Sequence, residues 1–130
     1  MPRRLLLMLG IVVLGLLGGC GNQDSPVNAV QSYVAGRVAS DTAKLQSLAC
    51  KDQESQALTD ADSFRSMKAS VDSMTCTQAG EDAPYTIVAC QGKILTEYAG
   101  ETRTWNLADR NFRTIKEDGQ WKVCGYQAAP

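Results

Sequence analysis

The sequence predicts an α+β domain in which helices from the first half of the chain pack on a four-strand antiparallel sheet from the second half. Between Ser25 and Met67, apolar residues recur at the spacing of amphipathic helices. After Met67 the pattern changes to alternation, and turn residues separate the alternating runs. Helices followed by strands is the order of an α+β fold, in which the helices cover one face of the sheet.

The first helix is expected to begin at Ser25-Pro26. A serine hydroxyl caps the free N–H groups of a helix start, and the missing N–H of proline costs nothing in the first turn. An apolar stripe at helical spacing follows and predicts the core-facing side of this helix. Its members are Val27, Val30, Tyr33, Val34 and Val38.

Two further helices are expected before the sheet. Ser40-Asp41 ends the first helix and caps a short second one, which continues through Leu45 and Leu48 to Cys50. A third helix is expected from about Glu54 to Met67. Its apolar side would be formed by Ala57, Leu58, Ala61 and Phe64.

Four strands are expected in the second half, at 71–79, 85–98, 102–116 and 121–127. The third has an expected kink at 108–111, and Gly92 within the second predicts a bulge or bend, because glycine relaxes the backbone. Asp118-Gly119 is the sharpest turn signal and favours a two-residue type I′ hairpin between the last two strands.

The first 20 residues have the order of an export signal. Arg3 and Arg4 supply a basic start, an apolar core runs from Leu5 to Leu17, and a small pair precedes Cys20. The apolar core is shorter than the roughly 20 residues that a membrane-spanning helix needs. The run Leu16-Leu17-Gly18-Gly19-Cys20 resembles the lipobox of bacterial lipoprotein signals.

The lipoprotein resemblance implies cleavage of residues 1–19 and attachment of acyl chains to Cys20. Two or three chains give durable membrane attachment, at about 0.8 kcal/mol per buried methylene. The domain, residues 26–127, would then stand at the extracytoplasmic face of the bacterial cell membrane on a short tether, residues 20–25. Because Gly21 rather than Asp follows Cys20, attachment to an outer membrane is also possible. The alternative to a lipoprotein signal is an ordinary secretory signal with a spare cysteine.

Charge and cysteine content narrow the function classes. Without Arg3 and Arg4 the chain carries a net charge of about −3, and it has no basic stripe for nucleic acid. Four cysteines remain beyond Cys20, an even number that favours two disulfides in an exported chain, with three possible connectivities. A four-thiolate metal site is a poor alternative, because there is no Cys-x-x-Cys pair, and no histidine is present to complete a mixed site.

The order of elements, the Ser25-Pro26 helix start and the closing hairpin around Asp118-Gly119 resemble the nuclear-transport-factor-2-like (cystatin-like) superfamily. The resemblance spans about residues 25–127 and implies a curved sheet with a cone-shaped pocket between sheet and helices. In such a fold Cys76 and Cys90 would lie on neighbouring strands at similar distances from their turn. A bond between Cys50, at a helix end, and Cys124 would then complete the set.

No catalytic constellation is recognised in the sequence. No imidazole base exists, and phosphate-loop, nucleophile-elbow and calcium-loop motifs are absent, so no catalytic residue, metal or cofactor is assigned. Two groups of charged residues are typical of a solvated surface: Asp109, Arg110 and Arg113 near the kink, and Glu97, Glu101 and Arg103, which flank another turn. Tyr33, Tyr98 and Tyr126 could line a pocket or fill it.

The sequence therefore favours a membrane-anchored, non-catalytic binding or interaction domain. An envelope protein would be its partner, and a homodimer through the exposed sheet face is left open. The alternatives are a carrier or sensor of a small apolar ligand and, less favoured, a carboxylate-based enzyme, which would need two acids facing one cleft.

Overall fold

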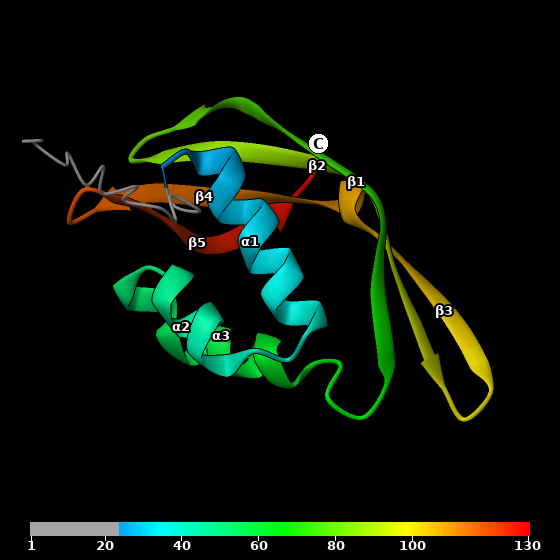
Figure 1. Ribbon diagram of the computed structural model, residues 1–130. Coiled ribbons are helices and arrows are strands. Elements are labelled where there is room, and N and C mark those ends of the chain that lie inside the picture. Colours follow the sequence, from blue (N-terminus) through cyan, green and yellow to red (C-terminus); the bar gives the residue numbers. More distant parts are fainter. Residues whose placement is uncertain (1–23) are drawn as a thin grey trace, which may run out of the picture.

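The computed structural model describes residues 24–130. The expected signal peptide, Cys20 and the start of the tether lie outside this range. Three α-helices come first, followed by five strands (Figure 1). The helices are α1 (Pro26–Val38), α2 (Thr42–Leu48) and α3 (Glu54–Asp62), with a 3-10 turn, η1 (Lys51–Gln53), before α3.

Polar caps fix the starts of the first two helices, as the sequence predicts. The Ser25 hydroxyl accepts a hydrogen bond from the Asn28 N–H at 3.0 Å, and Pro26 occupies the first turn. The Asp41 carboxylate accepts one from the Lys44 N–H at 3.1 Å. Each cap satisfies a donor that the helix itself leaves free.

The third helix is shorter than expected, ending at Asp62 rather than Met67. The Ser63 hydroxyl donates to the Thr59 carbonyl, and the chain continues in tight turns whose N–H groups bond three residues back. Phe64, in these turns, is still buried. Leu58 was wrongly expected on the apolar side: it is 41% exposed, because the helix packs through Ala57 and Ala61.

The sheet is antiparallel and has five strands, one more than expected. β2 lies between β1 on one side and both β3 and β4 on the other, and β5 follows β4. The single strand expected at 102–116 is divided by a 3-10 turn, η2 (Leu107–Asp109), so that β3 pairs with one half of β2 and β4 with the other. The bounds are β1 (Lys68–Asp82), β2 (Tyr85–Tyr98), β3 (Glu101–Asn106), β4 (Arg110–Glu117) and β5 (Gln120–Ala128).

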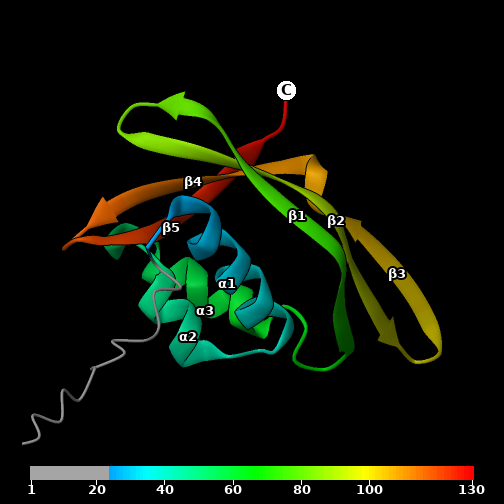
Figure 2. The same cartoon turned by 45° about the horizontal axis from the view of Figure 1, so that its top comes forward.

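A bulge at Gly92 bends the two longest strands. Ser73 and Met74 of β1 stand opposite Gly92 alone, and Gly92 has φ +110°. A Cβ at this position would lie 2.6 Å from the Ser73 carbonyl oxygen, so only glycine fits. β1 and β2 turn around the helices along their length (Figure 2).

The core lies between α1 and the inner face of the sheet. Val30 and Val34 of α1 and Leu45 of α2 pack with Val88 and Val123 of the sheet in one buried cluster. Each such side chain contributes roughly 1.5–3 kcal/mol by leaving water. The helices thereby cover one face of β1, β2, β4 and β5, while β3 is exposed along its whole length.

Two disulfides join the same cysteine pairs that the nuclear-transport-factor-2-like resemblance implies. Cys76 and Cys90 face each other across β1 and β2, and Cys50 is bonded to Cys124 on β5. The Cys50 N–H also donates to the Val123 carbonyl at 2.9 Å. A bulge at Gly125 of β5 shifts the register, and both Val123 and Cys124 are buried.

The closing hairpin has the turn that its sequence predicts. Asp118 and Gly119 alone connect β4 to β5, and their φ angles are +51° and +77°. Positive φ at both central residues is the requirement of a type I′ turn, whose twist matches that of the paired strands.

Candidate functional site

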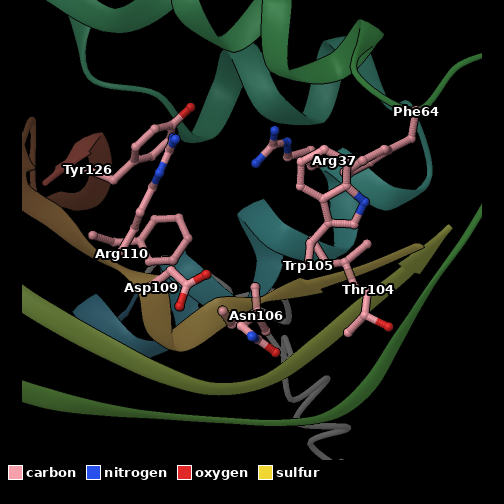
Figure 3. Close-up of a pocket in the computed structure, with 11 residues that line it drawn as sticks. Arg37, Phe64, Thr104, Trp105, Asn106, Asp109, Arg110 and Tyr126 are labelled. Carbon is pink, nitrogen blue, oxygen red and sulfur yellow. The ribbon is translucent and has the colours of Figure 1, made fainter. Parts of the chain in front are cut away.

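A cavity of about 420 Å³ lies between the end of α1, the turn after α3 and the segment in which β3, η2 and β4 follow one another (Figure 3). Its volume lies in the range of about 300–1,000 Å³ that small-molecule sites occupy. The η2 turn creates it, because it breaks the strand and carries β3 away from β4. The lining residues are Arg37, Phe64, Ile94, Thr104, Trp105, Asn106, Leu107, Asp109, Arg110, Phe112 and Tyr126.

Aromatic rings form two walls of the cavity. Phe64, from the turn after α3, meets Trp105 of β3 edge to face, with ring centroids 6.1 Å apart. Phe112 and Tyr126, on the paired strands β4 and β5, meet in the same way at 5.9 Å. The Trp105 indole N–H donates to the Thr96 hydroxyl at 3.1 Å, which fixes a ring that is nevertheless 47% exposed.

Arg37 extends from the last turn of α1 into the cavity (Figure 3). Its guanidinium carbon lies 5.1 Å from the centre of the Phe64 ring, and Nη2 donates to the Ser63 hydroxyl at 3.3 Å. Its Nε is buried and has no acceptor within the described chain. The guanidinium is therefore positioned by a ring and one hydrogen bond, with donor capacity unused.

Arg110 enters the cavity from the start of β4. Its guanidinium carbon lies 5.0 Å from the centre of the Tyr126 ring. Neither Arg110 nor Arg37 has a carboxylate within ion-pair distance: the ion pair that residues 24–130 contain is Arg65 with Asp62, at the surface. Asp109, the third charged residue of the lining, is likewise unpaired within that range.

Behind the cavity, Asp60 of α3 is buried and holds three elements together. Its carboxylate accepts hydrogen bonds from the Tyr33 hydroxyl of α1 at 2.7 Å and from the Tyr126 hydroxyl of β5 at 3.2 Å. The Gln56 amide of α3 adds a third at 3.1 Å. These bonds satisfy a carboxylate that is only 2% exposed.

The environment of Asp60 keeps both tyrosine hydroxyls protonated. Burial raises the pKa of Tyr33 strongly above its ordinary value, and the hydrogen bond to Asp60 adds to the effect. Burial also raises the pKa of Tyr126, followed by the negative charge of Asp60. Tyr33 and Tyr126 are therefore hydrogen-bond donors at neutral pH rather than bases.

The three tyrosines singled out in the sequence do not share one cavity. Tyr126 lines it, whereas Tyr33 is 4% exposed and fills the core beneath α1. Tyr98 was wrongly grouped with them: it is 61% exposed and lies at the far end of β2, on the β2–β3 hairpin that projects beyond the helices (Figure 1). It borders a smaller hollow of about 160 Å³ with Met67 and Arg103.

Other lining residues had weak or no sequence signals. Asp109 and Arg110 do line the cavity, because the expected kink places them at its rim. Arg113 does not; its guanidinium lies over the Tyr85 ring instead. Arg37 and Trp105 were missed, since one arginine at a helix end and one tryptophan in a strand are ordinary.

Residues 24–130 contain neither a cluster of metal ligands nor a helix that could span a membrane. Nowhere in 24–130 do three metal-ligating side chains of the His, Cys, Asp or Glu types come together. Over the same residues, no helix has the length and apolar character required to cross a membrane.

Comparisons with known proteins give one structural likeness. No family model matches the sequence, and no curated protein matches it. The solution structure of a SEC-C motif containing protein from Rhodopseudomonas palustris is similar, with a TM-score of 0.54 and 12% sequence identity. The match covers 82% of this chain and 80% of that one. At this identity the likeness concerns the fold alone.

Proposed function

We propose that this chain is a lipid-anchored protein of the bacterial cell envelope whose domain binds a small molecule in the Arg37–Arg110 cavity without transforming it. The observation that carries the proposal is a cavity of about 420 Å³ into which two unpaired arginines and several aromatic rings project. A pocket that combines apolar walls with a few converging polar groups is the usual form of a small-ligand site.

The anchor is proposed from the lipobox and is supported by the disulfides. Bonds such as Cys50–Cys124 and Cys76–Cys90 persist in oxidising compartments outside the cytoplasm. Acyl chains on Cys20 would hold the domain at the extracytoplasmic face of the cell membrane, or at an outer membrane where one exists. The cavity would then sample small molecules outside the cytoplasm.

Membership of the nuclear-transport-factor-2-like superfamily is part of the proposal. Its support is the order of three helices and then an antiparallel sheet, with long strands bent at the Gly92 bulge around those helices. The position of the cavity, between the helices and the bent sheet, is the place where that fold has its cone-shaped pocket.

A non-catalytic role fits the placement of the acids. A carboxylate-based enzyme would need two acids facing one cleft. Asp60 is the single charged side chain among the buried residues of the described chain, and three donors already bond its carboxylate. Asp109 is exposed at the rim of the cavity and has no second acid among the other lining residues.

The test is native mass spectrometry of the lipidated full chain, purified in a nonionic detergent and exposed to a small-molecule library. Trp105→Ala removes an aromatic wall of the cavity, and Thr102→Ala truncates an exposed position of β3 outside it. We expect binding to be retained in the wild type and in Thr102→Ala and to be strongly weakened in Trp105→Ala. Ligands that bind all three proteins equally would contradict the proposal.

A second candidate, an interaction domain for another envelope protein, is favoured by the β2–β3 hairpin. Tyr98 and Trp105 expose 61% and 47% of their surfaces there. Exposed aromatic residues are enriched at protein interfaces. Tyr98→Ser should weaken such an association, or the formation of a homodimer, without affecting ligand binding. Sedimentation of the wild type and the variant in the same detergent would measure the association.

A further inference from the structure

We infer that the ligand of the cavity is a small organic monoanion: an aromatic or otherwise planar body that carries one carboxylate. This inference rests on the proposed small-molecule function and specifies its ligand class. It follows from the donors that the cavity leaves free, from the balance of its charges and from the spacing of its aromatic walls.

The two arginines of the cavity have hydrogen-bond donors that no group within the described chain uses. A guanidinium has five N–H groups, and that of Arg37 makes one hydrogen bond, from Nη2 to Ser63. Its Nε is buried without an acceptor, and the Arg110 guanidinium makes no hydrogen bond within residues 24–130. A carboxylate matches the planar fork of a guanidinium and accepts two of its N–H groups at once.

The two arginines are also directed at a common space. Arg37 comes from α1 and Arg110 from the start of β4, and the Arg37 guanidinium points toward the side where Tyr126 and Arg110 lie (Figure 3). The Phe64 and Tyr126 rings, each about 5 Å from one guanidinium carbon, support these orientations. An anion between the two side chains would be held from two elements of the fold.

The charge balance favours a single negative charge. The lining contains two arginines and one acid, Asp109, so one unit of positive charge is uncompensated at neutral pH. A monoanion balances the charges of the lining, whereas a dianion such as a phosphate monoester would leave an uncompensated negative charge near Asp109.

The aromatic walls of the cavity indicate the chemistry of the ligand beyond its carboxylate. Trp105 and Phe64 stand on one side and Phe112 and Tyr126 on the other, and these rings offer stacking and edge contacts to a planar body. A volume of about 420 Å³ suits a body of one to three rings. The apolar part would contact the rings while the carboxylate reaches the arginines.

The experiment is a calorimetric titration of 2-naphthoate into the lipidated full chain in nonionic detergent micelles, with 2-naphthamide as the neutral isostere. We expect a Kd for 2-naphthoate of about 1 mM or below, and binding of the amide at least about tenfold weaker. Arg110→Gln and Arg37→Gln should each weaken the binding of 2-naphthoate about tenfold. Arg65 is exposed and lies outside the cavity, so Arg65→Gln should leave the affinity for 2-naphthoate unchanged.

Arg110 is exposed, so Arg110→Gln keeps the test valid even if Arg37→Gln unfolds the domain. Equal affinities for acid and amide, or a 2-naphthoate affinity that Arg110→Gln leaves unchanged, would overturn the inference. So would tighter binding of 2-naphthyl phosphate than of 2-naphthoate, or no binding of 2-naphthoate. A ligand whose binding is strongly weakened by Trp105→Ala, but which binds equally well as acid and as amide, would leave the proposed function standing and refute only the anion.

Discussion

The Tyr126 hydroxyl donates a hydrogen bond to the Asp60 carboxylate across 3.2 Å, joining a wall of the cavity to the helix behind it. The two residues are 66 positions apart in the sequence. The same carboxylate accepts a shorter bond from Tyr33, so one buried acid fixes α1, α3 and β5 relative to one another. The shape of the cavity therefore depends on a hydrogen-bonded group that does not line it.

Removing the Tyr33 hydroxyl should cost more stability than removing that of Tyr126. Tyr33→Phe deletes a fully buried bond and leaves Asp60 short of a donor, which we expect to cost about 1–3 kcal/mol. Tyr126→Phe deletes a longer, half-buried bond and should cost about 1 kcal/mol or less. Urea unfolding at pH 7 measures both. The reverse order would contradict the role assigned to Tyr33.

Tyr33 should also make stability depend on alkaline pH. Its pKa is raised by folding, so the unfolded chain releases the proton near the ordinary value of 10.0 while the folded domain retains it. The contribution of protonated Tyr33 to the free energy of unfolding is complete below pH 10 and is lost as the pH rises above 10. In Tyr33→Phe the fall of unfolding free energy between pH 10 and 11.5 should be shallower than in the wild type. Tyr98→Phe, at an exposed position, is the control and should behave as the wild type.

The two disulfides should contribute unequally. In the chain-entropy model, the bond that closes 74 residues, Cys50–Cys124, stabilises by about 4.5 kcal/mol, and the bond that closes 14, Cys76–Cys90, by about 3 kcal/mol. Replacing each pair by alanines and measuring urea unfolding tests the difference. A Cys76/Cys90 double variant that is the less stable of the two would show that loop length does not control the effect.

Gly92→Ala should destabilise the domain by at least about 2 kcal/mol, because the new Cβ meets the Ser73 carbonyl at 2.6 Å and φ is +110°. Gly80→Ala is a matched control: Gly80 also has positive φ, but nothing lies within 4 Å of its Cβ position. The two variants differ in the close contact, so thermal unfolding should show a markedly larger loss for Gly92→Ala. Equal losses would mean that β1 and β2 can separate without cost.

Cys20→Ala should abolish membrane attachment. Without the thiol no acyl chain can be added, and we expect unprocessed or soluble protein in place of mature, detergent-partitioning protein. Phase separation in detergent and intact mass provide the measurement. A variant of mature mass that still partitions into the detergent phase would contradict the lipid anchor.

Local signals in the sequence predict the fold best. The caps at Ser25 and Asp41 and the turn at Asp118-Gly119 act within a few residues, so they can be read directly from the chain. The early end of α3 could not be predicted, nor could the separation of β3 from β4 at the expected kink, because both depend on packing. Leu107, buried within η2, takes part in the core at the point where the strand breaks.

The cavity was predictable only in part. Its place between helices and sheet follows from the fold, and Tyr126 was singled out among candidates. Arg37 could not be selected, because the sequence does not show that its Nε is left without an acceptor or that Phe64 lies under its guanidinium. Both facts arise from residues brought together by folding.

The most direct test of the small-molecule function is a proton–nitrogen NMR spectrum of the full chain with a library of ring-containing compounds added. The two tryptophans provide internal probes: Trp105 lines the cavity, and Trp121 packs against the core on β5. We predict that bound compounds shift the Trp105 indole N–H and leave that of Trp121 in place. Compounds that bind while the Trp105 signal stays unchanged would contradict the cavity as the functional site.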